Sequence, residues 1–437
     1  MLNARPVEGT FRSLRSYANV ILIAILFAIP WIRIHGEPLV LLDVPGRRFH
    51  IFGLVIFPQE LYFLWLVVIG AALSLFFFTA LFGRLWCGYA CPQTVFTDVF
   101  AGIARRIEGW KGSVRPRRVA RWRVVLTHAV WVAASLVIGF HLVGYFVSPY
   151  QLVADVRAGV AHPILLGFLL AVSLLSYLDF VFMRQIFCRF LCPYARFQGV
   201  LFDRNTLVIG YDEARGEPRG KRGTTDGSCV DCGLCVAVCP SEIDIRDGLQ
   251  LDCISCTQCI DACDGVMERL GRPKKLIGYR TLAGGSGWEG LTLGRPRVMI
   301  YGALLLLVVG SFAGLLVQRE PMGLHVAHNR DALYTTMADG RIGNAFTLQL
   351  ENRGGEERRF RIRLEEADRF DLVAGMNPVT IPGAGHLEAR VFVVARDASV
   401  ASRSQPVRFV LEPEDGGSTG LVRETRFLSP RGGRHES

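Results

Sequence analysis

The chain of 437 residues is 51% hydrophobic and 20% charged, with a mean hydropathy of +0.31. This balance is too apolar for an ordinary soluble protein and too charged for a chain embedded wholly in lipid, so a membrane part with soluble attachments is expected. A net charge of +10 would also fit nucleic-acid binding, but the placement of the basic residues makes that interpretation unnecessary.

Five apolar runs approach the length of about 20 residues that a helix needs to cross a bilayer. They cover residues 17–34, 60–82, 124–147, 162–183 and 297–317. The first run follows Arg12 and Arg15 and could be taken for a signal peptide. No clear small-residue cleavage site follows it, so a retained helix is expected. Residues 17–183 are then a four-helix membrane domain that follows a short N-terminal segment of residues 1–16.

Lys and Arg are distributed unequally between the spans. Nine lie in residues 83–123, whereas residues 35–59 contain two and residues 148–161 contain one. The positive-inside rule therefore predicts that the N-terminus, residues 83–123 and residues 184–296 face the cytoplasm, with the chain after about residue 318 outside. All twelve cysteines then fall on or beside the cytoplasmic side, where metal ligation is expected rather than disulfide bonds.

The predicted cytoplasmic segment contains two runs of four cysteines, CVDCGLCVAVC and CISCTQCIDAC. In this spacing three thiolates hold one [4Fe–4S] cluster and the fourth reaches the other cluster. The predicted ligands are Cys229, Cys232, Cys235 and Cys263 for cluster 1, and Cys239, Cys253, Cys256 and Cys259 for cluster 2. Zinc is the alternative for Cys-x-x-Cys pairs, but two complete runs in tandem argue against it. Residues 225–270 are thus the expected core of a ferredoxin-like module.

Two further cysteine pairs repeat one pattern, WCGYACPQ at 86–93 and FCRFLCPY at 187–194. Cysteines four residues apart share one face of a helix, and the proline after each pair suits the first turn of a new helix. We therefore expect each motif to end a transmembrane helix, with an interfacial helix after the first motif. A thiol at a helix start is expected to have a lowered pKa.

If these two halves pair as an internal repeat, four thiols meet at the cytoplasmic rim: Cys87, Cys91, Cys188 and Cys192. Soft sulfur ligands favour Cu(I), zinc or iron–sulfur clusters. The alternative is that these cysteines are only small buried apolar residues.

After the fifth span, residues 318–437 contain no cysteine and alternate apolar with polar side chains. AFTLQLEN, RRFRIRLEE, EARVFVVA and VRFVLEP are typical of strands, which predicts an immunoglobulin-like β-sandwich. Before them, Met322, His325 and His328 are expected in a juxtamembrane linker, with copper ligation as the alternative. The predicted fold class is mixed: a polytopic α-helical membrane protein of five helices with a ferredoxin-like module and a C-terminal β-sandwich.

The two Cys-x-x-x-Cys-Pro pairs together with a dicluster ferredoxin segment resemble two families. One comprises the quinol-oxidising iron–sulfur membrane proteins of periplasmic nitrate reduction. The other is the cytochrome c oxidase accessory protein family called CcoG, FixG or RdxA. The external immunoglobulin-like domain, and the stretch NRDALYTTMADGRIGNAFTLQLEN that leads into it, resemble the accessory family.

This resemblance implies a role in assembling cbb3-type cytochrome oxidase, with reduction of Cu(II) to Cu(I) as the activity. Copper would then be a substrate or transient ligand at Cys87, Cys91, Cys188 and Cys192, which would be the catalytic residues. The implied partners are oxidase assembly factors, a copper-exporting ATPase or copper chaperone, and a cytoplasmic electron donor. The implied location is the bacterial inner membrane, with the clusters cytoplasmic and the C-terminal domain periplasmic. Two alternatives remain open, namely a quinol dehydrogenase using the same clusters and a non-enzymatic assembly scaffold.

Overall fold

The computed structural model describes residues 4–34, 36–110, 119–220, 226–281, 293–329, 332–397, 404–414 and 420–430. The chain divides into two compact units, Met1–Ala313 and Gly314–Ser437, and each is described by itself. Four of the nine basic residues counted between 83 and 123 lie outside the described residues: Lys111, Arg115, Arg117 and Arg118.

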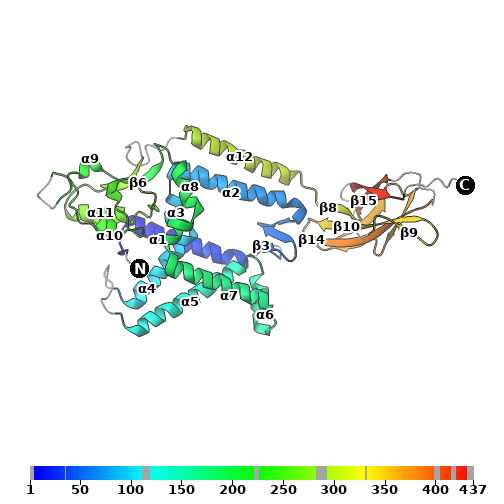
Figure 1. The fold of residues 1–437 in the computed structure, drawn as a ribbon, viewed down its shortest axis with the longest axis horizontal. Helices are drawn as coiled ribbons and strands as arrows, with labels where there is room; N and C mark the ends of the chain where they lie inside the picture. Colours follow the sequence, from blue (N-terminus) through cyan, green and yellow to red (C-terminus); the bar gives the residue numbers. More distant parts are fainter. Residues whose placement is uncertain are drawn as a thin grey trace. The chain divides into compact units, whose positions relative to one another are not determined.

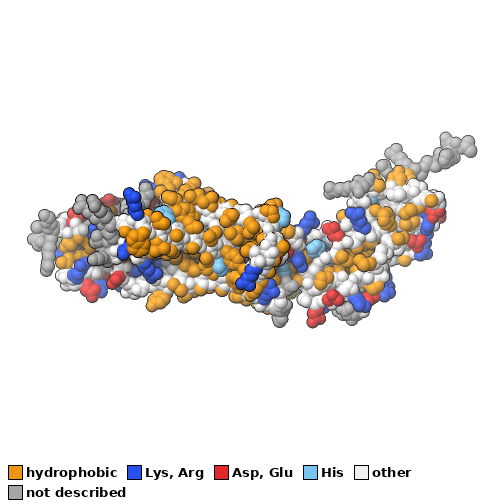
Figure 2. All heavy atoms as spheres, turned by 90° about the horizontal axis from the view of Figure 1, so that it is seen from below, with side chains coloured by type: hydrophobic (Ala, Val, Ile, Leu, Met, Phe, Trp, Pro, Cys, Tyr) orange, Lys and Arg blue, Asp and Glu red, His pale blue; other side chains and the backbone are white. Residues whose placement is uncertain are grey.

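Within the described residues, five helices are long and apolar enough to cross a membrane, so the five predicted spans are confirmed as helices. They are built on α1 (Thr10–Ala28), α2 (Leu61–Phe82), α5 (Arg121–Val143), α7 (Pro163–Leu178) and α12 (Pro296–Val317) (Figure 1). Figure 2 shows hydrophobic side chains gathered over this helical part. Large apolar side chains of the spanning helices, such as Trp65, Leu174 and Leu306, are exposed, as expected for a surface that faces lipid.

The first helix begins at Thr10, seven residues before the apolar run predicted from the sequence. Gly9, the residue before the helix, offers no side-chain cap. Instead, Asp261 of α11 (Gln258–Arg269) accepts hydrogen bonds from the backbone N–H groups of Phe11 at 3.2 Å and Arg12 at 2.7 Å. These N–H groups have no partner within the helix, so a carboxylate from a distant segment extends α1 toward the N-terminus.

The membrane helices pack through aromatic side chains. The helix α4 (Pro92–Glu108), predicted after the first Cys-x-x-x-Cys-Pro motif, packs on α5, and α5 packs on α7 (Figure 1). Their shared core contains Phe100, Trp131 and Phe180, and the Trp131 indole donates to the Phe100 carbonyl at 2.9 Å. The helices α2 and α12 meet through Phe63 and Phe312, whose ring centroids lie 5.4 Å apart.

Short elements complete the first unit. A small antiparallel sheet between α1 and α2 was not predicted; it comprises β3 (Val40–Asp43), β4 (Arg48–Ile51) and β5 (Leu54–Ile56), after the pair β1 (Arg33–Ile34) and β2 (Glu37–Pro38). The short helices are α3 (Leu85–Tyr89), α6 (Pro149–Ala158) and α8 (Pro193–Leu201). Two π-helical turns, Asp179–Met183 and Phe187–Leu191, follow α7.

The ferredoxin module is closed by a two-stranded ribbon, β6 (Leu207–Tyr211) paired antiparallel with β7 (Ile277–Thr281). Between these strands lie α9 (Glu213–Gly216), α10 (Leu234–Ala237), a 3-10 turn at Ile245–Asp247, and α11. Ile209, Ile260 and Met267 are buried with Cys229 and Cys235 in one core. The ribbon therefore joins the two ends of the cysteine-rich segment into one compact module.

The second unit is a β-sandwich, as predicted. One sheet has the order β12 (Phe370–Ala374), β14 (Gly385–Ala395), β10 (Ile342–Asn352) and β8 (Met322–His328), with β9 (Thr335–Thr336) also on β10. The other has the order β13 (Val379–Ile381), β11 (Arg358–Leu364), β15 (Ser404–Pro413) and β16 (Leu421–Leu428). Alternate residues of both sheets, including Phe346, Phe360 and Phe409, form its core.

The linker predicted at residues 322–328 is wrong, because this segment is the strand β8 paired with β10. Met322 is buried in the sandwich core. The His328 ring is hydrogen-bonded to Asn344 Oδ1 at 3.0 Å and to the Asn329 carbonyl at 3.0 Å. Copper ligation by Met322, His325 and His328 also finds no support. Met322 packs in the core of the sandwich, and both ring nitrogens of His328 are hydrogen-bonded within it.

Candidate metal and electron-transfer site

The eight cysteines of the ferredoxin module surround two small apolar cavities. One cavity is lined by Cys229, Cys232, Cys235 and Cys263. The other is lined by Cys239, Cys253, Cys256 and Cys259, and also by Cys235 of the first set. These two sets are the ones that the exchange of fourth cysteines between the runs predicts. The donor sets therefore fit two clusters.

The two cysteine runs also share the same backbone conformation at equivalent positions. Asp231 and Gly233, two and four residues after the first cysteine of the first run, have positive φ angles of 48° and 66°. Ser255 and Thr257, at the equivalent places of the second run, have φ angles of 52° and 62°. Left-handed backbone is rare for residues other than glycine, so the same loop shape is held twice around the two cavities.

The cysteines do not converge on single points. Across the described part of the chain, no group of three or more His, Cys, Asp or Glu side chains is placed to hold one metal ion. A [4Fe–4S] cluster presents four separate iron atoms, so its four thiolates stand apart from one another. A structural zinc site instead needs four ligands around one ion. What favours clusters is that each cavity is lined by cysteines of both runs, as the exchange of the fourth ligand requires.

Each Cys-x-x-x-Cys-Pro motif begins a new helix at its proline, as predicted. The membrane-spanning helices that the motifs were expected to end stop a few residues earlier, at Phe82 and Met183. Cys91 caps α4, whose first residue is Pro92, and Cys192 caps α8, whose first residue is Pro193. Cys87 lies in α3. Its counterpart Cys188 lies in the π-helical turn Phe187–Leu191, so the two copies share their prolines and caps but differ in helix type.

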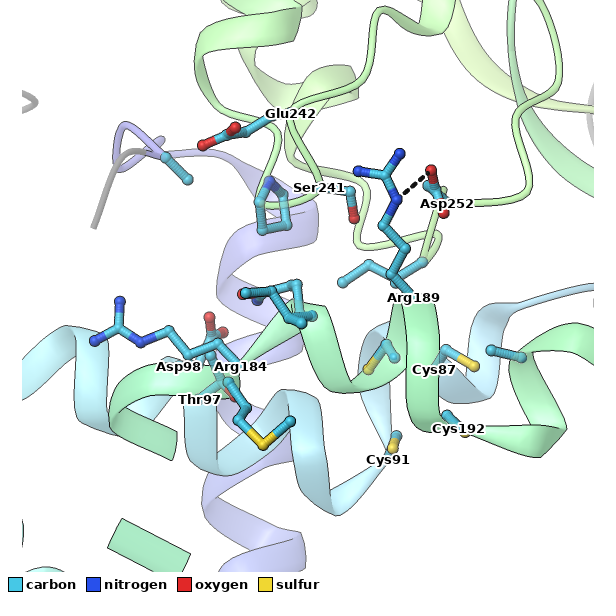
Figure 3. A pocket seen from close by; sticks show the side chains of 18 of the residues that line it. Cys87, Cys91, Thr97, Asp98, Arg184, Arg189, Cys192, Ser241, Glu242 and Asp252 are labelled. Carbon is cyan, nitrogen blue, oxygen red and sulfur yellow. Dashed lines mark ion pairs between the residues drawn. The ribbon is translucent and has the colours of Figure 1, made fainter. Parts of the chain in front are cut away.

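All four of these thiols line one cavity of about 530 Å³ (Figure 3). Figure 3 shows Cys87, Cys91 and Cys192 near one another in this four-cysteine cavity, and Cys188 also lines it. The predicted lowering of the thiol pKa is wrong. Burial raises the pKa of Cys91, the thiol at the start of α4, although the backbone N–H groups of Thr94 and Gln93 act in the opposite direction. Desolvation therefore outweighs the helix N-terminus here.

Gln198 of α8 is a buried polar residue against these thiols. Its side chain is fully buried, and its Oε1 accepts a hydrogen bond from the Cys87 thiol at 3.5 Å. Its amide nitrogen has no hydrogen-bond partner in good geometry among the described residues, although the Tyr194 hydroxyl is close to it. An unsatisfied buried donor is uncommon, and here it belongs to the side chain that contacts the Cys87 sulfur.

Arg84 joins the four-cysteine cavity to the loop of cluster 2. Its side chain is 5% exposed. The guanidinium donates to the carbonyl of Leu251, to that of Cys253 at 3.5 Å, and to that of Ala195. One side chain therefore ties the first motif both to the second motif's helix and to the second cysteine run.

The helix α3 also touches this loop through its backbone. A Cβ atom at Gly88 would lie 2.5 Å from the Ser255 carbonyl oxygen and 2.9 Å from that of Ile254. Only glycine permits so close an approach. Cys87 is the neighbour of Gly88, and Ser255 lies between the ligands Cys253 and Cys256, so the two thiol sites are in adjacent, contacting segments.

This contact gives a direct prediction. We expect Gly88→Ala to destabilise the protein by about 1–3 kcal/mol, because the added methyl group forces α3 away from the loop. The matched change Gly102→Ala, in the interior of α4 with open space around it, should be neutral or stabilising by up to about 1 kcal/mol. The temperature at which cluster absorbance is lost measures both. Equal melting of the two variants would contradict the close contact.

The rest of the cavity is rich in charge. Six arginines and three carboxylates line it: Arg12, Arg84, Arg105, Arg184, Arg189 and Arg196, with Asp98, Glu242 and Asp252. Arg189 pairs with Asp252 at 3.1 Å, as the dashed line in Figure 3 shows. Asp98 pairs with Arg12 at 2.7 Å and with the buried Arg15 at 2.9 Å. None of these pairs could be inferred from sequence spacing, because each joins segments far apart in the chain.

The comparisons with known proteins agree with this geometry. A model of a 4Fe-4S dicluster domain matches residues 183–282, and one of a 4Fe-4S binding domain matches residues 63–111. A model of the IG-like fold at the C-terminus of FixG matches residues 312–430. The three matches together cover most of the chain, with the second Cys-x-x-x-Cys-Pro motif inside the first of them.

Three curated proteins resemble the chain over most of its length. Protein RdxA of Cereibacter sphaeroides is 38% identical over 98% of this chain and 93% of its own length. Protein RdxB of the same organism is 35% identical over 98% of this chain and 96% of its own length. The nitrogen fixation protein FixG of Rhizobium meliloti is 35% identical over 83% of this chain and 78% of its own length. The chain therefore belongs to the FixG/RdxA family of iron–sulfur electron-transfer proteins.

Proposed function

We propose that this protein is a membrane-bound copper reductase that serves the assembly of a cbb3-type cytochrome oxidase. The observation that carries the proposal is the contact between two thiol sites. The four-cysteine cavity is packed against the loop of cluster 2 through Arg84 and Gly88. An electron carrier and a set of soft sulfur ligands in contacting segments are what one-electron reduction of copper requires.

The eight cysteines of the ferredoxin module are the proposed cluster ligands, in the two sets that line the two cavities. When bound, each cluster supplies one electron at a time. The four thiols of the neighbouring cavity bind copper, because thiolate is a ligand that selects Cu(I) over harder ions. A pair of thiolates suffices for Cu(I), so four thiols that do not converge on one point can still hold it in pairs.

The reaction transfers one electron to each Cu(II) and yields one Cu(I). The electron comes from a low-potential one-electron donor on the cytoplasmic side, and the Cu(I) passes to a copper-exporting ATPase or a copper chaperone. The proposed orientation follows from the unequal distribution of Lys and Arg. The clusters then face the cytoplasm of the bacterial inner membrane, and the β-sandwich lies in the periplasm, where it meets oxidase assembly factors.

The volume of the cavity favours one second candidate. About 530 Å³ exceeds what a copper ion needs and lies within the range of pockets that hold small organic molecules. A quinol that delivers electrons to the same clusters is therefore the competing function.

The test presents the purified protein, reconstituted in liposomes, with each reactant in turn. We expect that Cu(II) reoxidises the clusters of the dithionite-reduced protein. We also expect that a quinol does not reduce the oxidised clusters. Reduction of the clusters by quinol, together with no response to Cu(II), would replace the proposal with the quinol dehydrogenase. If neither Cu(II) nor quinol changes the oxidation state of the clusters, the function of an assembly scaffold would replace the proposal.

A further inference from the structure

Arg15 places a positive charge inside the protein where the first apolar helix meets the ferredoxin module. The residue is 1% exposed. Its Nη2 pairs with Asp98 of α4 at 2.9 Å, and the same carboxylate oxygen pairs with Arg12 at 2.7 Å. Its Nε has no hydrogen-bond partner among the described residues. A buried cation that shares one carboxylate with another arginine is costly, so a further negative group is expected on its buried side.

The loops of cluster 2 lie on that side. One orientation of the Gln258 amide gives both its oxygen and its nitrogen a hydrogen-bond partner. In this orientation the oxygen accepts from Arg15 Nη1 at 2.9 Å and the nitrogen donates to the Val238 carbonyl at 3.3 Å. Gln258 follows Cys256 by two residues, and Val238 precedes Cys239. Gln258 thus links the Arg15 guanidinium to the two segments that carry Cys256 and Cys239, both ligands of cluster 2. The guanidinium is therefore within electrostatic reach of a cluster 2 ligand.

The docking of α1 on α11 holds Arg15 in this place. Asp261 of α11 accepts hydrogen bonds from the backbone N–H groups of Phe11 and Arg12. A Cβ atom at Gly9 would lie 2.3 Å from the Asp261 side chain, so the chain enters the helix in close contact with α11. These contacts fix the start of α1 on α11, and with it the backbone from which Arg15 extends.

The two sets of ligand loops differ in the charged side chains that contact them. At the loops of cluster 2, the buried Arg15 meets the Gln258 amide, and the buried Arg84 donates to the carbonyls of Leu251 and Cys253. At cluster 1, Arg246 lines the cavity of the four cysteines. The Arg246 guanidinium is neutralised by contacts of 2.6 Å to both Asp231 and Asp244. The surroundings of cluster 2 are therefore the more positive.

We infer that Arg15 raises the reduction potential of cluster 2 above that of cluster 1. Reduction adds one negative charge to a cluster, and a nearby buried cation stabilises that charge. An electron that enters the module then resides on the cluster whose loop touches the four-cysteine cavity. The inference concerns the clusters alone and holds whether the acceptor is copper or another molecule, so it can fail or succeed independently of the proposed function.

The test is a potentiometric titration of the full-length protein, purified anaerobically in detergent and followed by the electron paramagnetic resonance of the reduced clusters. The wild type should show two midpoint potentials. Arg15→Gln should move the higher one to lower potential and leave the lower one in place, and Arg15→Lys, which keeps the charge, should restore it. Arg106→Gln removes a positive charge from the exposed face of α4 and should move neither.

Asp98→Asn should shift the higher midpoint potential in the opposite direction. It removes the carboxylate that neutralises Arg15, so the higher potential should rise. A purely structural role for Arg15 predicts no such pair of opposite shifts. The inference is overturned if Arg15→Gln moves neither potential or both equally, or if Asp98→Asn leaves the higher potential unchanged or lowers it. Should Arg15→Gln bind fewer than about eight iron atoms per chain, the Asp98→Asn and Arg15→Lys results decide.

Discussion

Replacement of Cys87 and Cys188 with serine should lower the rate of Cu(II) reduction by at least roughly tenfold while the protein keeps its full iron content. One thiol of each pair is lost, and serine oxygen is a poor ligand for Cu(I). The proposed cluster ligands are unchanged. Cys87 and Cys188 line the four-cysteine cavity, and neither lines the two cavities of the ferredoxin module. Single-turnover kinetics with a Cu(I)-specific chelator measure the rate, and iron analysis measures the content.

Thr97→Ser is the control for this double variant, because it alters another side chain that lines the same cavity and keeps its hydroxyl. Its rate should stay within about twofold of the wild type, since no ligand or charge changes. A double cysteine variant that reduces copper at the wild-type rate would remove the four thiols from the mechanism. A loss of iron in that variant would instead show that these thiols support the clusters.

Arg84→Gln should destabilise the protein by about 3 kcal/mol or more. The substitution leaves the carbonyls of Leu251, Cys253 and Ala195 without their charged donor, and hydrogen bonds from a charged group contribute about 1.5–3 kcal/mol each. The effect should appear as loss of cluster absorbance at a lower temperature than in the wild type. Both the cavity and the cluster 2 loop should loosen, because this side chain joins them.

Arg189→Gln is the matched control for Arg84→Gln. Both arginines line the four-cysteine cavity, and both contact the segment of residues 251–253. The Arg189 side chain is 55% exposed and pairs with the half-buried Asp252, and surface ion pairs are worth about 0–1 kcal/mol. The two variants should therefore differ clearly in thermal stability. Equal stability would contradict the role of Arg84 as a buried connection between the two sites.

Much of the fold could be predicted because its signals are local. The apolar runs have spanning length, the sandwich strands alternate, and the cysteine runs have ferredoxin spacing. Pro92 and Pro193 marked the starts of α4 and α8 for the same reason. The small sheet of residues 40–56 was missed because its strands are three or four residues long and too short for a clear alternation.

The residues that connect the sites could not be predicted, since their roles depend on contacts across the chain. Arg12 and Arg15 looked like the basic residues that precede a membrane segment. In the structure they lie within α1 and pair with Asp98, 83 or more residues away in sequence. Gln198 carries no sequence signal at all. The thiol pKa was predicted in the wrong direction because burial cannot be read from a helix start.

Two further pairs of residues stand at similar places in the two copies: Arg84 and Arg184, three and four residues before the first cysteine, and Phe96 and Phe197, five residues after the second. The members of each pair differ in the structure. Arg84 is buried among backbone carbonyls, whereas its counterpart Arg184 donates to the Phe180 carbonyl at 3.1 Å and lies over the Trp131 ring. Phe96 is buried, but its counterpart Phe197 is 63% exposed. The repeat therefore preserves the positions of the thiols and prolines, while the cluster 2 loop is contacted through the first copy's arginine.

The most direct test of the account is an anaerobic titration of the fully reduced protein with Cu(II). Cluster absorbance and a Cu(I)-specific chelator are followed together, after removal of excess reductant. We expect reoxidation of the clusters with about two Cu(I) formed per chain, one electron from each cluster. Clusters that stay reduced in the presence of Cu(II), with no Cu(I) formed, would contradict it.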